Sequence, residues 1–421
     1  MARVLKGHPL DLAVFRVTVF IVVLGSPDLH GAWKWAALPE AARMPVPGWD
    51  WVIRGWPPTL DAARIVYGVF LVSAALGLLG LLTRVATICA ALSGAWLLGL
   101  PQMSGQVLHT HHLVWFLVLL AASPCGDALS IDARLGRRPR AEAIEYGLPL
   151  RIAWVSIGLL FFFAGYWKLA AGGLGWGDGL GRQMQFKWLQ TGIPPLVRAD
   201  LYPQLLRPAG MLAIAFELSI GAFLLWGRTR LWAVAAALLF HAGVRVTMGI
   251  SFSALWVCYV MFIPWAKWLE LAPTPQLQAT RRWVPAMLFG GGLLALQLLT
   301  GFAGQEHSWP VACYPTFRHA PPTEIAWIEA DDQTDAGLRA ALVLSDLRGP
   351  DGQRWWGVGW RVLGDPTPEA LAAHYRARRG EPGSDVRAVD FYRVTPSGRA
   401  FLWRWTHSNR GAGVGVPPRT P

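Results

Sequence analysis

Charged residues are scarce in this chain of 421 residues: they make up 15% of it, against 53% hydrophobic residues. The few charges gather in short segments between long apolar stretches. Soluble globular domains carry a larger share of charged residues. The composition therefore argues against an ordinary soluble domain and predicts a polytopic membrane protein.

Cysteine is also scarce, with four residues and no Cys-x-x-Cys motif. We expect Cys89 and Cys258 inside membrane spans, Cys125 at a cytoplasmic helix end and Cys313 outside, so the sequence predicts neither a disulfide framework nor a cysteine-based zinc site. A phosphate loop, a dinucleotide fingerprint and a Gly-x-Ser-x-Gly elbow are missing too. These absences argue against nucleotide hydrolysis and hydride transfer.

About nine segments are long and apolar enough to span a bilayer, taking roughly 17 to 25 residues as the requirement. We expect the second and third to form a tight hairpin around LLTR, and the seventh and eighth to turn at residues 249–251. Arg16 interrupts the first segment, which predicts an anchor and not a removable signal peptide. The segments lie near residues 10–27, 65–83, 84–101, 107–124, 149–171, 208–227, 229–249, 251–269 and 283–303.

The basic residues predict the orientation. With a cytoplasmic N-terminus, nine spans place short loops rich in arginine and lysine on the cytoplasmic side, and longer loops with sparser basic residues on the other side, as the positive-inside rule requires. The C-terminus is then extracytoplasmic, in a multi-pass protein of the cell membrane. The net charge of +12 is spread over many loops, so we predict no nucleic-acid partner. Arg16 is expected to snorkel or to cap carbonyl groups.

The chain changes character after about residue 304. We predict a transmembrane bundle over 1–304, a small extracytoplasmic α+β module over 305–410 and a disordered tail over 411–421. In the module, ALVLSDLRGPDGQRWWGVGWRVL and VRAVDFYRVTPSGRAFLWRW each read as two strands around a turn. Thr367 and Pro368 open a helix that runs to about Arg378. The fold class is thus an all-α membrane bundle with a small α+β module.

Ionisable residues gather in the outer half of the predicted bilayer. Lys168 lies near the outer end of the fifth span, and an ionisable residue at that depth is a candidate functional residue. His109 and His112 begin the fourth span, and His241 and Arg245 approach the outer end of the seventh. A snorkelling lysine and histidines bonded to carbonyl groups are the structural alternatives. A histidine metal site is a chemical alternative, weak because the ten histidines are scattered.

Glu217 lies near the middle of the sixth span. An unpaired carboxylate there would become neutral or find a cation, and Lys168 and Arg245 are its candidate partners. A structural ion pair and a catalytic one are both open at this point.

Four segments together resemble a known family. FRVTVFIVVLG, HHLVWFLVLLAASPCGDALSIDARLG, FFFAGYWKLAAGGLGWGDG and FHAGVRVTMGISFSALWV are similar in order and spacing to the HTTM membrane core, which vitamin K-dependent γ-glutamyl carboxylase shares. The resemblance covers about residues 8 to 270. It implies that Lys168 is the catalytic base, assisted by His112, and that His241 and Glu217 correspond to a Phe-His motif and an acidic membrane position. Trp167 stands where the carboxylase has a second lysine.

The resemblance also implies a cofactor, a reduced vitamin K or menaquinol-type naphthoquinone that oxygen converts to an epoxide. We assign catalysis to Lys168, His112 and His241, and cofactor contact to His109, Trp167, Arg245 and Glu217, with no metal. A neutral lysine among apolar side chains suits deprotonation of a hydroquinone, and we expect Lys168→Ala to leave folding nearly intact. Peptide carboxylation is less supported, since only about 115 residues are expected outside the membrane.

Three classes of function follow. The first is a quinol-oxidising membrane enzyme whose partners are membrane lipid and a lipid-soluble quinone. The second is a non-catalytic scaffold or maturation factor for an exported protein, peptide or lipid. The third is a small-molecule transporter, which would want internal repeats and broken helices near the midplane.

Overall fold

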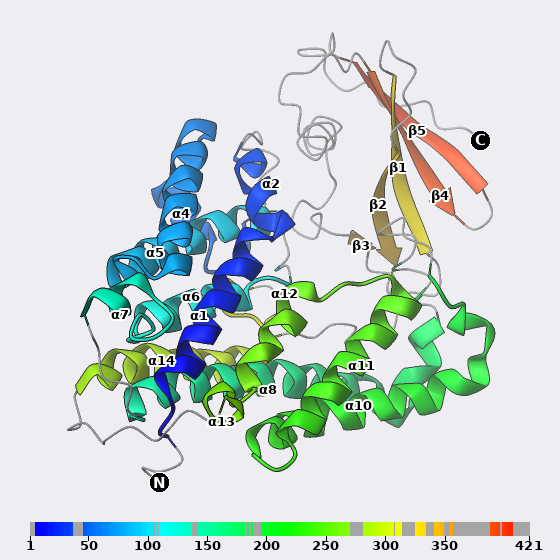
Figure 1. Ribbon diagram of the computed structural model, residues 1–421. Helices are drawn as coiled ribbons and strands as arrows, with labels where there is room; N and C mark the ends of the chain where they lie inside the picture. The colour runs from blue at the N-terminus through cyan, green and yellow to red at the C-terminus, as the bar shows by residue number, and fades with distance from the viewer. Residues whose placement is uncertain are drawn as a thin grey trace.

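The computed structural model describes residues 5–36, 45–103, 107, 109–136, 142–181, 183–184, 187, 195–269, 281–306 and 308–313, followed by five strands. The first part is a bundle of helices, and the strands form a separate sheet (Figure 1). The first half of the bundle consists of α1 (Pro9–Leu24), α2 (Pro27–Trp35), α3 (Asp50–Gly55), α4 (Leu60–Leu79), α5 (Thr83–Gly99), η2 (Leu100–Met103), α6 (His112–Ala121) and α7 (Ile131–Gly136). The second half consists of α8 (Ile144–Gly172), η3 (Gly173–Gly179), η4 (Ala199–Leu201), α10 (Pro203–Leu225), α11 (Arg230–Met248), α12 (Ser253–Trp256), η5 (Val257–Phe262), α13 (Trp265–Trp268), η6 (Arg281–Trp283) and α14 (Val284–Phe302).

Helices occur at all nine predicted segments, but not all nine are long enough to cross a bilayer. Within the described residues, six helices are long and apolar enough to cross a membrane. The count rises to seven if the bent pair α1 and α2 forms one span. The expected count of nine spans is therefore too high. The shortfall comes from α6, which begins only at His112, and from α12 with η5, where the chain changes from α to 3-10 geometry after four residues. The protein is therefore a multi-pass membrane protein.

The tight α4–α5 hairpin is confirmed, and its turn has a clear local cause. The Thr59 hydroxyl accepts a hydrogen bond from the Ala62 amide at the start of α4. Gly80 ends the helix at φ +69°, a conformation that glycine adopts without steric cost. A Cβ there would lie 2.2 Å from the Cβ of Ser130, so the turn also packs against the loop that follows α6.

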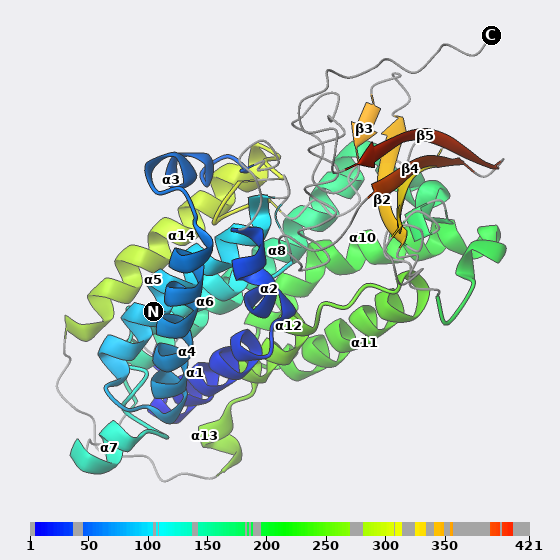
Figure 2. The same cartoon turned by 90° about the horizontal axis from the view of Figure 1, so that it is seen from above.

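Contacts between distant segments define two ends of the bundle. At one end, which we call the basic end, Gly7 pairs with Ala143, the Ala266 amide donates to Asp11, and Arg282 pairs with Asp127. At the opposite end, the Leu196 amide donates to Val246 and the Trp309 amide donates to Pro47. The antiparallel helices run between these ends. Figure 2 shows α8 lying between α14 and α10.

The segment that follows α14 returns to the bundle. The Trp115 indole donates to the Pro310 carbonyl at 2.7 Å, and the rings of Trp49 and Trp309 meet edge to face with centroids 6.1 Å apart. Val311, Ala312 and Cys313 are buried. These described residues beyond 304 thus pack with the membrane helices, and the predicted division into domains stays a prediction.

The five strands form one antiparallel sheet. They are β1 (Ile325–Gln333), β2 (Ala341–Arg348), β3 (Arg354–Trp356), β4 (Ala388–Thr395) and β5 (Gly398–Thr406), in the order β3-β2-β1-β4-β5. The two predicted hairpins are present, with Arg348 opposite Arg354 and Thr395 opposite Gly398. The central strand β1 was not predicted from its sequence, IAWIEADDQ. The expected helix at Thr367 and the tail after residue 410 lie outside the described residues.

Candidate functional site

Lys168 and Glu217 form an ion pair inside the bundle. The Nζ atom of Lys168, on α8, donates a hydrogen bond to Oε1 of Glu217, on α10. Both residues are only 4% exposed. Of the two candidate partners for Glu217, Lys168 is the one that pairs with it. Arg245 instead donates to the Gly249 carbonyl at 2.7 Å, at the end of α11.

Trp176 covers the ammonium group of Lys168. The Lys168 Nζ lies 5.2 Å from the centre of the indole ring, within the range of a cation–π contact. Trp176 belongs to η3, the 3-10 turn that continues α8. The lysine is therefore held between a carboxylate and an aromatic face, an arrangement that suits a charged ammonium group.

Glycines allow α8 and α10 to approach closely enough for this pair. A Cβ on Gly165 would lie 2.9 Å from the Cβ of Glu217, and a Cβ on Gly210 would lie 2.4 Å from the Cα of Gly177. Gly158 and Gly221 face each other in the same way, with a Cβ on Gly221 placed 3.0 Å from the Cα of Gly158. Small residues at such contacts let membrane helices pack backbone to backbone. The pair is thus a product of one close helix crossing.

His241 lies in a cluster of aromatic rings next to this crossing. Its Nε2 atom is 2.7 Å from the hydroxyl of Tyr259, and its ring centroid lies 5.8 Å from that of Phe161 and 5.2 Å from that of Phe252. Phe216 and Phe240 stack with centroids 4.6 Å apart, and both rings contact Phe161. Because Phe161 precedes Lys168 by seven residues, the two point from nearly the same face of α8, about 10 Å apart along its axis.

His109 and His112 meet the same cluster from the start of α6. The His112 Nε2 atom is 2.9 Å from the Ala254 carbonyl, so it carries the proton of that hydrogen bond. The His109 ring lies 4.9 Å from Phe252, the residue that also contacts His241. The three predicted histidines therefore surround the segment at residues 252–259, and Phe161 connects them to the level of Lys168. Their shared cavity stays a prediction.

Trp167 points away from this cluster, since its indole donates to the Gly301 carbonyl of α14 at 2.8 Å. Trp176 and Tyr259 touch the candidate residues but were not singled out from the sequence. Nothing in the sequence indicated that the 3-10 segment after α8 would fold back over Lys168.

Two polar atoms in this region have no hydrogen-bond partner among the described residues. They are Oε2 of Glu217 and Nδ1 of His241, and both are buried. A buried polar atom without a partner costs about 1 to 3 kcal/mol. Each atom is a place where a water molecule or a polar group of a ligand would be stabilised. Among the same residues, no group of three His, Cys, Asp or Glu side chains is arranged to hold a metal ion.

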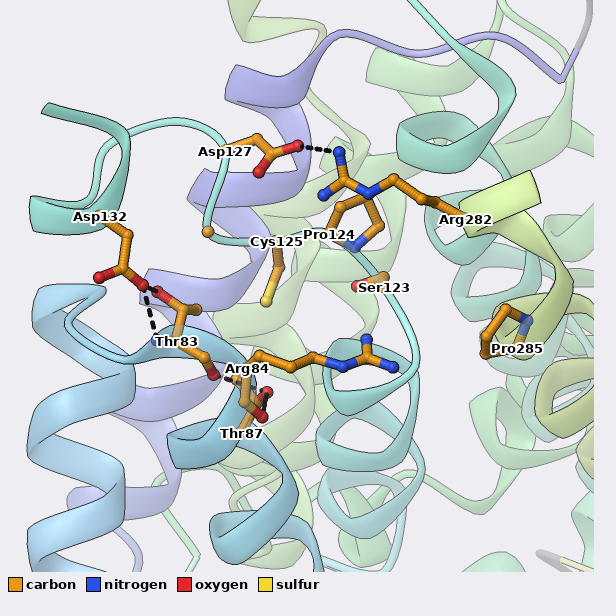
Figure 3. A pocket seen from close by; sticks show the side chains of 11 residues that line it. Thr83, Arg84, Thr87, Ser123, Pro124, Cys125, Asp127, Asp132, Arg282 and Pro285 are labelled. Carbon is orange, nitrogen blue, oxygen red and sulfur yellow. Dashed lines mark hydrogen bonds and ion pairs between the residues drawn. The ribbon is translucent and has the colours of Figure 1, made fainter. Parts of the chain in front are cut away.

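A cavity of about 530 Å³ opens at the basic end, far along the bundle from this site (Figure 3). Asp132 accepts hydrogen bonds from the amide and hydroxyl of Thr83, and Asp127 pairs with Arg282 at 2.8 Å. Arg84 extends across the opening in Figure 3. Burial raises the pKa of the Cys125 thiol in its wall to about 11. None of the sequence-predicted site residues lines this cavity.

The loop that forms the floor of this cavity is organised by Arg16. The buried guanidinium of Arg16 donates to the carbonyls of Cys125 at 2.7 Å and Ala128 at 3.4 Å, and also to that of Leu129 at 2.5 Å. The predicted role of Arg16 in capping carbonyl groups is confirmed.

The fold and site define a multi-pass helical membrane protein with an ion pair and three histidines buried among aromatic rings. Comparison with known families gives a more specific assignment. The HTTM domain matches residues 8–267, more than half of the chain, and the chain belongs to the HTTM domain family. No match was found among curated proteins or among solved structures.

Proposed function

We propose that this protein is a membrane enzyme that oxidises a reduced naphthoquinone, with the Lys168–Glu217 pair as its proton acceptor. The observation that carries the proposal is the pair itself, buried beside aromatic rings, with Glu217 Oε2 and His241 Nδ1 left without partners among the described residues. A flat apolar ring that carries hydroxyl groups matches this combination of rings and unpaired polar atoms.

The pair can accept one proton as a unit. The Glu217 carboxylate takes the bridging proton of the Lys168 ammonium group, and the neutral Lys168 amine that results is the base that accepts a proton from the hydroquinone. Two groups coupled this closely titrate together and not separately. The pair therefore removes the need for a lysine that is neutral on its own, and Trp176 holds the lysine in place in both forms.

The histidines have a positioning role in this proposal. His241 is oriented by Tyr259, and His112 by the Ala254 carbonyl. Overall, a hydroquinone and O₂ would give a quinone epoxide and water, with one atom of O₂ in the epoxide and the other in the water. The rings of Phe216 and Phe240 are in contact with each other. For the ring of a quinol to enter between them, these two side chains would have to move apart.

The orientation is part of the proposal: the basic end is cytoplasmic, with the N-terminus on that side and the C-terminus extracytoplasmic. At the opposite end, three of the arginines pair with aspartates, namely Arg54 with Asp50, Arg198 with Asp200 and Arg207 with Asp178. At the basic end, Lys6, Arg84, Arg228 and Lys267 have no carboxylate partner among the described residues. Unneutralised basic residues collect on the cytoplasmic side of membrane proteins.

Oxygen uptake by the purified protein with reduced menaquinone or phylloquinone tests the activity. Lys168→Arg keeps a cation beside Glu217 but should abolish uptake, because guanidinium does not release its proton in proteins. Arg228→Gln, at the other end of the bundle, is the matched control and should keep the parental rate. Mass spectrometry of the purified protein should detect a naphthoquinone in the parent. Equal rates in the parent and Lys168→Arg, or no uptake with any quinol tried, would favour a scaffold for an exported protein.

A further inference from the structure

A second cavity lies at the basic end, where the start of α1 meets α8, α11 and α13. Its volume is about 190 Å³, many times the roughly 10 to 15 Å³ that one water molecule needs. Four cationic side chains line it, from four different segments, against two carboxylates. The cations are Lys6, Arg151, Arg230 and Lys267, and the carboxylates are Asp11 and Glu142.

Two of these cations are held close together by one aromatic ring. The guanidinium carbons of Arg151 and Arg230 lie 4.0 Å and 4.1 Å from the centre of the Trp154 ring. Arg230 is fixed there because its Nε atom donates to the Leu224 carbonyl at 3.0 Å. Two positive charges that pack on the same ring repel each other, and the repulsion is stronger near a bilayer than in water. An anion in the cavity that both residues line would relieve it.

The two lysines add charge that the protein does not neutralise. Neither Lys6 nor Lys267 has a hydrogen-bond or ion-pair partner among the described residues. Asp11, one of the two carboxylates, already accepts a hydrogen bond from the Ala266 amide at 3.0 Å. The cavity therefore has an excess of positive charge and free ammonium donors.

The larger cavity of Figure 3 provides the contrast. It has two arginines and two aspartates, and both carboxylates are occupied, by Thr83 and by Arg282. Its formal charge is balanced, so it offers no comparable attraction for an anion.

The short helix α13 gives the depth of the smaller cavity in the membrane. Trp268 and Leu269 are exposed beside Lys267, at 55% and 59%. Exposed indoles next to a lysine are typical of the headgroup layer of a bilayer. The cavity thus opens where phospholipid phosphates lie.

We propose that this cavity binds the phosphate of an anionic phospholipid headgroup, with Arg151 and Arg230 as the fixed part of the site and Lys6 and Lys267 as the adjustable part. Guanidinium groups match phosphate oxygens in pairs, and ammonium groups act as mobile point charges. The site lies at the opposite end of the bundle from Lys168 and does not depend on the activity proposed there.

Binding of short-chain phosphatidylglycerol to the purified full chain in detergent, measured by native mass spectrometry, tests the proposal. Phosphatidylcholine with the same acyl chains is the ligand control. We expect Lys6→Gln and Lys267→Gln each to lower the affinity for phosphatidylglycerol about fivefold, and the double variant about 25-fold, as expected for the loss of basic groups at an anionic surface. Among the described residues these lysines make no hydrogen bond or ion pair that glutamine would remove, so folding should be preserved, which a melting curve checks.

Arg84→Gln, in the charge-balanced cavity, is the matched control and should bind phosphatidylglycerol as the parent does. Equal binding of the two lipids by the parent, or unchanged binding by the double variant, would overturn the proposal. Inorganic phosphate at millimolar concentration separates the two sources of the anion. Competition with phosphatidylglycerol supports a phosphate site that lipid occupies, whereas binding of inorganic phosphate without any binding of the lipid rules out the headgroup.

Discussion

Lys168 and Glu217 lie 49 positions apart in the chain and share one buried hydrogen bond between α8 and α10. Neither side chain has enough exposed surface to keep its own hydration, so each depends on the other for its charge. Ion pairs withdrawn from water are costly to form and more costly to break, because breaking leaves a single charge in a medium that cannot solvate it. This dependence sets what variants of the pair should do.

Lys168→Ala should destabilise the protein by about 3 to 5 kcal/mol, since it leaves the Glu217 carboxylate buried without a cation. The sequence-based expectation of nearly intact folding treated the lysine as an isolated amine, whereas its ion pair with Glu217 predicts a loss of stability. Lys168→Met combined with Glu217→Leu removes both charges and should recover most of the lost stability. Thermal unfolding in detergent measures both variants.

A double-mutant comparison also separates stability from chemistry. The Lys168→Met and Glu217→Leu combination should fold and be inactive in oxygen uptake. If the double variant were no more stable than Lys168→Ala, the two charges would not be coupled in the way the structure shows.

The candidate residues could be identified from the sequence because a charged or polar residue inside an apolar segment is evident without knowledge of the fold. Lys168, Glu217, Arg16 and the histidines all stand out in this way. The choice of Lys168 over Arg245 as the partner of Glu217 could not be found, because it depends on the close crossing of α8 and α10 at Gly165. Glycine in an apolar segment does not indicate which helix it faces.

The span count and the central strand were missed for different physical reasons. Hydropathy registers apolar residues but not the geometry of the backbone, so the 3-10 segment η5 read as part of a full span. The strand β1 carries three acidic residues, Glu329, Asp331 and Asp332, and these interrupt the alternation by which strands are recognised. Its pairing with both β2 and β4 is a tertiary property.

Gly210→Ala should destabilise the bundle by about 1 to 3 kcal/mol, the range for overpacking. The added methyl group would lie 2.4 Å from the Cα of Gly177, a backbone atom that cannot rotate away. Gly243→Ala is the matched control, because a Cβ there has no neighbour within 4 Å. That control should be neutral or slightly stabilising, as alanine favours helix over glycine. Melting temperatures that rank the two variants in the reverse order would contradict the close crossing of η3 and α10.

Arg16→Met should destabilise the loop at residues 122–132 and the protein as a whole by about 3 kcal/mol or more. It removes donors from three carbonyl groups, and hydrogen bonds to a charged group contribute about 1.5 to 3 kcal/mol each. Arg16→Lys should recover little, because one ammonium group cannot reach carbonyls arranged for a guanidinium fork. Hydrogen exchange of this loop, compared with that of the α10–α11 turn in the same sample, reports the effect. Unchanged exchange in Arg16→Met would mean that the loop is held by other contacts.

Leu196→Cys and Arg228→Cys should be labelled from opposite sides of the membrane. Both positions are exposed, and they lie at the opposite end and at the basic end of the bundle respectively. With the basic end in the cytoplasm, a membrane-impermeant maleimide added to intact cells should label Leu196→Cys and should label Arg228→Cys only after lysis. The parent is the background control, and its buried Cys125, whose thiol pKa is raised to about 11, should be almost entirely thiol at pH 8 and react slowly. Labelling of both variants from outside would contradict the two-ended arrangement of the helices, and the reversed pattern would keep that arrangement while overturning the proposed orientation.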